Sequence, residues 1–99
     1  MNKNSSHHNP HDKTVTELAE RLRSQGLRVQ ADVSGFRKPP LMTGVRPDIV
    51  ARGPGVPPLI IEVETKKSMP TDLAQRRALR EHAEQMGADF KVVRARRRT

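Results

Sequence analysis

The chain has 99 residues, of which 33% are hydrophobic, and 19 Lys and Arg stand against 11 Asp and Glu, giving a net charge of +8. This length leaves room for one small domain, and the lack of cysteine excludes disulfides, thiolate metal sites and thiol catalysis. Two Phe and no Tyr or Trp disfavour a base-stacking platform, whereas the excess of positive charge indicates a polyanionic partner, above all nucleic acid. In the alternative interpretation, the excess of positive charge only keeps the protein soluble.

The sequence shows no membrane or export signal. The longest apolar stretch, at residues 59–63 and interrupted by Glu62, is far shorter than the roughly 20 residues that span a bilayer. The first residues do not form a charged-then-apolar secretory signal. We therefore expect a cytoplasmic protein without a membrane partner.

The chain divides into a polar tail at 1–12, a domain at 13–94 and a basic tail at 95–99. The first segment has no periodicity, which predicts disorder. Three of its residues, His7, His8 and His11, could suggest a metal site. A disordered segment would bind metal at a high entropic cost and offers no supporting shell, so we assign these histidines no function.

The domain is expected to begin with a helix and a strand. Residues 14–25 carry apolar side chains three and four apart, Thr14 and Glu17 fit a capping box, and Gly26 is placed to end the helix. Residues 27–33 alternate apolar and polar side chains, as in a half-buried strand. A loop rich in Gly and Pro follows.

Two more strands, a second helix and a last strand complete the expected order. We predict strands at 45–51, 59–64 and 90–93, a tight connection at 53–58, and a helix at 72–86 capped by Thr71. The strand at 59–64 is almost continuously apolar and is therefore expected to be central. The inner face of the helix is expected to comprise Leu73, Leu79, Ala83 and Met86, with Gly87 ending it. An α/β fold with this strand flanked by helices is the simplest layered solution.

Three acids are predicted to meet where two strands pair. Glu62 and Glu64 share one face of their strand, while Ile61 and Val63 face the core. A hairpin would bring Asp48 opposite them, and three carboxylates together favour a divalent cation such as Mg²⁺ or Mn²⁺. In the alternative, Glu62 faces solvent and Glu64 pairs with Lys66 or with an arginine of the second helix.

The stretches RPDIVARG and LIIEVETKKS resemble the PD-(D/E)XK nuclease superfamily, whose restriction-endonuclease-like fold is shared by Holliday-junction resolvases. The resemblance covers about residues 14–94, and the expected element order agrees with that family's α-β-β-β-α-β core, a mixed sheet flanked by two helices. Pro47 and Asp48 match the PD, and Glu62 matches the acidic member of the signature. The resemblance implies a metal-dependent endonuclease acting on DNA, often as a homodimer.

The lysine of the signature is replaced here by Glu64. In the family that lysine is thought to activate water or to stabilise charge at the phosphate, and some members carry a glutamate there as a further metal ligand. The resemblance thus implies Asp48, Glu62 and Glu64 as metal ligands, with Lys66 as a substitute cation. A phosphate contact or an ion pair with Glu64 is the other interpretation of Lys66.

The expected reaction is hydrolysis of a phosphodiester bond. Substrate binding is assigned to Arg76, Arg77, Arg80, Arg94, Arg96, Arg97 and Arg98, which would follow the phosphate backbone rather than read sequence. The missing lysine and the small size favour an alternative, a catalytically inactive nucleic-acid-binding module on the same fold. A basic accessory protein that acts through partner contacts is a third hypothesis.

Overall fold

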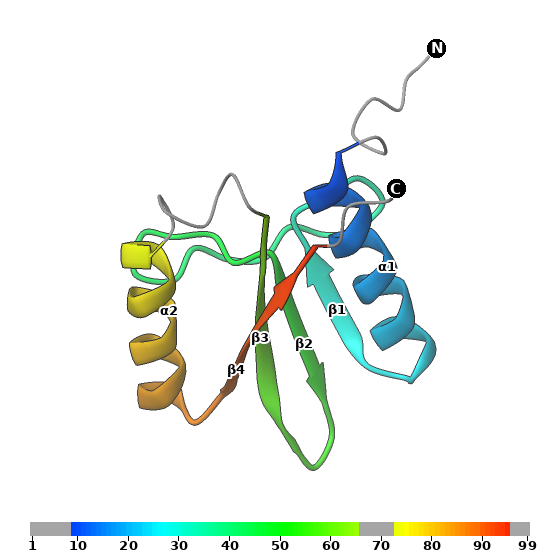
Figure 1. Cartoon of the computed structure of the whole chain (residues 1–99). Helices are drawn as coiled ribbons and strands as arrows, with labels where there is room; N and C mark the ends of the chain where they lie inside the picture. The colour runs from blue at the N-terminus through cyan, green and yellow to red at the C-terminus, as the bar shows by residue number, and fades with distance from the viewer. Residues whose placement is uncertain (1–8, 66–72, 96–99) are drawn as a thin grey trace.

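Two helices enclose a four-stranded sheet in the computed structural model, which describes residues 9–65 and 73–95 (Figure 1). The elements are α1 (Pro10–Ser24), β1 (Arg28–Ala31), β2 (Ile49–Gly53), β3 (Val56–Glu64), α2 (Leu73–Met86) and β4 (Asp89–Arg94). The predicted α/β class and the α-β-β-β-α-β order are confirmed.

The sheet is mixed, with the strand order β1-β2-β3-β4. β1 and β3 each run antiparallel to β2, while β4 runs parallel to β3. A parallel pair needs a crossover connection, which contains α2 here. β3 is an inner strand, as its continuous apolar character predicted.

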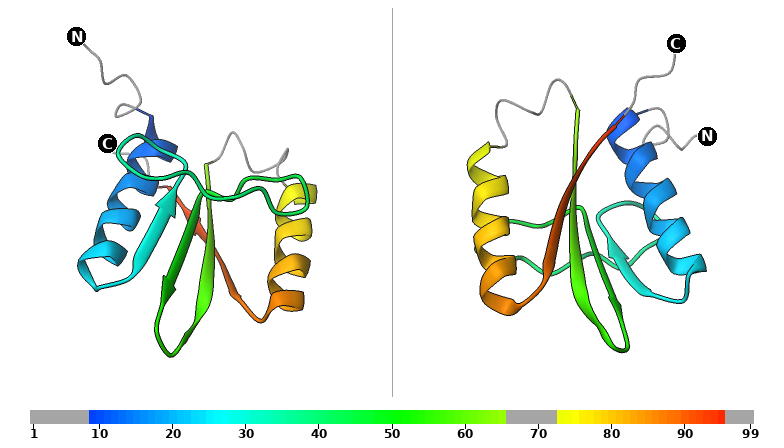
Figure 2. Two further views of the ribbon diagram at one scale, coloured as in Figure 1. Left: turned by 180° about the vertical axis from the view of Figure 1, so that it is seen from behind. Right: turned by 60° about the horizontal axis from the view of Figure 1, so that its bottom comes forward.

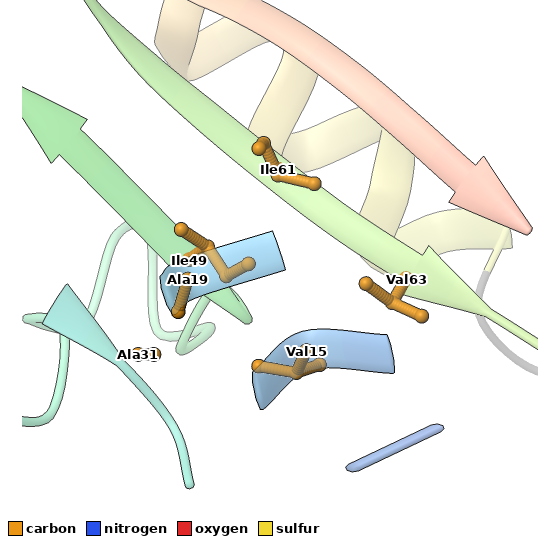
Figure 3. Packing of buried hydrophobic residues seen from close by; sticks show 6 residues of the cluster. All are labelled: Val15, Ala19, Ala31, Ile49, Ile61 and Val63. Atoms are coloured by element: carbon orange, nitrogen blue, oxygen red, sulfur yellow. The ribbon is translucent and has the colours of Figure 1, made fainter. Parts of the chain in front are cut away.

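Each face of the sheet packs against one helix, giving three layers (Figure 2). Ile49 and Ile61, which pair across β2 and β3, pack with Val15 and Ala19 of α1 (Figure 3). The neighbouring pair Val50 and Ile60 points to the opposite face of the sheet. This pair packs against Leu79 and Ala83 of α2 and against Met42 of the connection before β2. Strand alternation therefore supplies two separate apolar clusters from the same short strands.

α1 begins four residues earlier than predicted, so the expectation of disorder was wrong for residues 9–12. Asn9 caps the helix by accepting a hydrogen bond of 2.8 Å from the backbone N–H of His11. Pro10 follows at the first helical position, where its fixed φ suits the helix and its missing N–H costs nothing. The predicted end is confirmed, since Gly26 has a φ of +92°.

The limits of β2 and β3 differ from the prediction. β2 starts at Ile49, because Val45 pairs with Met42 instead of with a strand. β3 extends back to Val56, so the predicted connection at 53–58 shrinks to the tight turn at Pro54 and Gly55, where Gly55 has a φ of +75°. The register shifts between Ala51 and Gly53, and such irregular ladder ends tolerate proline.

α2 was predicted with a longer inner face than it has. Leu79 and Ala83 are buried, but Leu73 is 57% exposed and Met86 is 38% exposed. These two side chains occupy the first and last positions of the helix, beyond the stretch that packs on the sheet. The predicted cap Thr71 lies outside the described residues.

Within the described parts of the chain, no helix has the length and apolar character needed to cross a bilayer.

Candidate functional site at one end of the sheet

The predicted acidic residues lie at the end of the sheet where both helices begin, at the top of Figure 1. Asp48 directly precedes β2, and Glu62 and Glu64 lie in the last part of β3. β4 ends at the same level, because Glu64 is in register with Arg94. This end of the sheet therefore combines carboxylates with the N-terminal halves of two helices.

Asp48 and Glu62 are brought together, as predicted. The backbone N–H of Asp48 donates to Oε2 of Glu62 at 2.9 Å. In return, the backbone N–H of Val63 donates to Oδ2 of Asp48 at 2.7 Å. Each carboxylate is thus fixed by the backbone of the other strand, just beyond the pair Ile49 and Ile61. The side chain of Asp48 is 15% exposed, so it is largely shielded but reachable.

His11 of α1 completes the surroundings of Asp48. Its Nε2 lies 3.2 Å from Oδ1 of Asp48, and its Nδ1 lies 3.0 Å from Oδ1 of Asp12. The hydrogen bond with Asp48 raises the pKa of His11 to about 9; Asp12 adds to this rise and burial opposes it. His11 is therefore positively charged at neutral pH and offsets the charge of Asp48.

Sequence reasoning left His11 without a function because it placed this residue in a disordered tail. The available signal was local: Asn9 followed by Pro10 is a favourable helix start, and it would have placed His11 in the first turn. Its contact with Asp48 joins residues 37 positions apart in the chain, and no spacing rule predicts that.

Glu64 has different partners from the other two acids. Its Oε1 lies 2.8 Å from Nη2 of Arg76 in α2, and its Oε2 lies 3.4 Å from both Nε and Nη2 of Arg94 in β4. The prediction that Glu64 could pair with an arginine of the second helix is confirmed. We call these three residues the Glu64 cluster.

The remaining residues predicted to contact nucleic acid or to replace the signature lysine lie either at exposed positions of α2 or outside the described residues. Arg77 and Arg80 are exposed on α2, and the guanidinium of Arg80 lies 5.6 Å from the centre of the Phe90 ring. Lys66 and the tail residues Arg96, Arg97 and Arg98 lie outside the described residues.

A divalent cation needs several hard donor atoms close together. Across residues 9–65 and 73–95, no three His, Cys, Asp or Glu side chains gather into a group able to hold a metal. Asp48 and Glu62 still form a pair of hard oxygen donors, and Mg²⁺ commonly takes only one or two carboxylates, with water and phosphate completing its shell. Both oxygens of Asp48 already face His11 and the backbone N–H of Val63, and both oxygens of Glu64 face arginines.

The sequence matches no protein-family model and none of the curated proteins with which it was compared.

Proposed function

We propose that this protein is a metal-dependent nuclease of the PD-(D/E)XK type that hydrolyses phosphodiester bonds in DNA, with Asp48 and Glu62 holding the cation. The observation that carries the proposal is the reciprocal fixing of these two carboxylates on paired strands. The α-β-β-β-α-β order and the mixed sheet agree with the restriction-endonuclease-like layout and support the same proposal.

The chemistry follows from the charges at this end of the sheet. A bound Mg²⁺ or Mn²⁺ would polarise the phosphate and lower the pKa of a coordinated water. Asp48 and Glu62 supply the negative charge that retains a cation, and the hydrogen bonds to the strand backbones keep their oxygens in place. Arg76 and Arg94 contact Glu64, two residues after Glu62 on the same strand, and would provide positive charge toward a phosphate.

DNA binding is assigned to the exposed arginines and to the basic tail. Arg77 and Arg80 of α2, Arg94 of β4 and the tail residues Arg96, Arg97 and Arg98 are the groups proposed to neutralise phosphates. Binding through such groups depends on counterion release, so the affinity should fall steeply with salt.

The test is a nicking assay on supercoiled plasmid and on branched DNA with Mg²⁺ or Mn²⁺, compared with EDTA. Asp48→Asn and Glu62→Gln keep the side-chain shapes and should each abolish cleavage while DNA binding in EDTA persists. Glu84→Gln removes a carboxylate from an exposed position of α2 and is the matched control that should cleave normally. Cleavage that survives in both Asp48→Asn and Glu62→Gln would refute the assignment.

One observation favours the second candidate, a nucleic-acid-binding module without catalysis. Glu64 stands at the position of the family's lysine and forms ion pairs with two arginines. Asp48 is already neutralised by His11. Salt-sensitive DNA binding without cleavage under either metal would establish this module. A gel shift with no salt-sensitive association to any nucleic acid would leave the basic accessory protein as the remaining hypothesis.

A further inference from the structure

The Glu64 cluster joins three elements of the fold around one carboxylate. Glu64 lies at the end of β3 and is 8% exposed, making it the one buried charged residue within the described parts of the chain. It contacts Arg76 from the N-terminal half of α2 and Arg94 from the end of β4. A buried charge is costly unless it is paired, so both arginines are held close by the need to compensate Glu64.

The two arginines differ in their access to solvent. The side chain of Arg76 is 16% exposed, whereas that of Arg94 is 56% exposed. Oε1 of Glu64 and Nη2 of Arg76 are both buried, and they attract each other at 2.8 Å without an aligned hydrogen bond. Arg76 therefore anchors Glu64 inside the protein, and Glu64 in turn restrains a guanidinium that water can reach.

The net charge of the cluster is positive. One carboxylate and two guanidiniums sum to +1, the charge that a single lysine would provide at this position of β3. Glu64 and Glu62 lie two residues apart on the same face of the strand, so this positive charge lies on the face that carries Glu62, two residues along β3.

We propose that Glu64 is a positioning residue that holds Arg94 as a phosphate-contacting group beside Asp48 and Glu62, instead of serving as a third ligand of the cation. The ligand class is the phosphodiester of a DNA backbone, for which a guanidinium supplies parallel N–H donors. This inference rests on the proposed function, because it places the substrate phosphate next to the carboxylate pair.

The test is a double-mutant cycle on DNA affinity, measured in EDTA with a fluorescein-labelled duplex so that no metal takes part. Arg94→Ala should weaken binding about 3- to 10-fold and reduce the slope of log K against log salt by about one. In the Glu64→Gln background the same substitution should change affinity by less than about 2-fold, because the arginine is no longer restrained. Arg94→Lys should restore the salt slope but only part of the affinity, because lysine lacks the planar fork.

The matched control is Arg28→Ala, which removes one positive charge from the start of β1, at the opposite edge and end of the sheet. Its effect on affinity should be the same in the wild-type and Glu64→Gln backgrounds. Equal effects of Arg94→Ala in both backgrounds would overturn the positioning role. If Arg94→Ala does not change the affinity of the otherwise wild-type protein, the phosphate contact is overturned. This part of the test does not depend on Glu64→Gln folding, because Arg94→Ala alters only an exposed side chain.

Calorimetric titration of Mn²⁺ separates the two roles of Glu64. The Glu64→Gln variant should bind Mn²⁺ within about 3-fold of the wild-type affinity, while Glu62→Gln should lose at least about 10-fold. An equal loss in both would make Glu64 a ligand and refute the inference while supporting the metal site. Wild-type protein that binds no Mn²⁺ and cleaves no DNA would refute the proposed function, yet the cycle in EDTA would still report on Arg94.

Discussion

Asp48 and Glu62 are each hydrogen-bonded to the backbone of the strand that carries the other. The N–H of Asp48 donates to the carboxylate of Glu62, and the N–H of Val63, the residue after Glu62, donates to the carboxylate of Asp48. This arrangement fixes two negative groups that would otherwise repel each other, and the side chain of Asp48 remains 15% exposed.

The first prediction concerns the stability that a bound cation adds. A ligand that binds only the folded state stabilises it by RT ln(1 + [L]/Kd), about 2.7 kcal/mol at one hundred times Kd. Mn²⁺ should therefore raise the Tm of the wild type further at each higher concentration, and EDTA should reverse the rise. Calorimetric melting of Asp48→Asn should show no such rise, whereas the exposed control Glu84→Gln should follow the wild type. A metal-dependent rise that survives in Asp48→Asn would contradict the site.

The second prediction concerns pH and His11. The folded protein holds this residue at a pKa of about 9, above the ordinary value of 6.5. Between these values the folded state retains a proton that the unfolded state has lost, so the free energy of unfolding falls as pH rises. The contribution of His11 is complete below about pH 6.5 and is lost as pH passes through about 9.

Urea unfolding of the wild type and of His11→Gln at pH 6, 7.5 and 9.5 measures this effect. At pH 6 the free energy of unfolding of the wild type should exceed that of the variant by about 1–2 kcal/mol, a modest value because solvent screens a partly exposed pair. By pH 9.5 this difference should be lost, because His11 has given up its proton. His82→Gln is the control, since it makes the same change of side chain at a residue of α2. A stability difference between wild type and His11→Gln that does not change with pH would show that the ion pair with Asp48 is not responsible.

Local patterns predicted those parts of the fold that depend on neighbours in sequence. Gly26 and Gly87 end the two helices, and both have a positive φ. The alternation of Ile61 with Glu62 correctly assigned Ile61 to the core beside α1, and turn residues correctly implied the hairpin that brings Asp48 opposite Glu62.

The parts that sequence reasoning missed depend on contacts between distant segments. Asp48 stabilises the positive charge of His11. Glu64 is surrounded by Arg76 and Arg94, which follow Glu64 by 12 and 30 positions in the sequence. Two interpretations of Glu64, as a metal ligand or as the partner of an arginine, have the same spacing in sequence. Only the packing of α2 and β4 against β3 distinguishes the geometry that each interpretation requires.

The third prediction tests the two apolar clusters. Ile60 is fully buried on the α2 side of the sheet, so Ile60→Ala should lower the free energy of unfolding by about 2–5 kcal/mol. Leu73 is 57% exposed at the start of α2, and Leu73→Ala should change the free energy of unfolding by less than about 0.5 kcal/mol. Urea denaturation followed by circular dichroism measures both. A large loss in the free energy of unfolding of Leu73→Ala would show that Leu73 belongs to the inner face of α2, as predicted from sequence.

The fourth prediction concerns the ion pair between Arg76 and Glu64. Replacing Arg76 by Met keeps an unbranched apolar stem but leaves a buried carboxylate with Arg94 as its remaining arginine partner among the described residues. Because Arg94 lies 3.4 Å away and is 56% exposed, it compensates the buried carboxylate only in part, and Arg76→Met should cost about 2–4 kcal/mol. Adding Glu64→Gln to this variant should recover at least half of the loss, since the charge that needed compensation is gone.

The exposed neighbour Arg77 provides the control for the same change of side chain. Arg77→Met should alter the free energy of unfolding by less than about 0.5 kcal/mol, with or without Glu64→Gln. Urea unfolding of the four combinations at each arginine gives the coupling energy directly. A coupling energy near zero for Arg76 and Glu64 would mean that solvent, and not α2, compensates Glu64. The anchor that restrains Arg94 would then be missing, and the cluster could not fix a guanidinium beside Asp48 and Glu62.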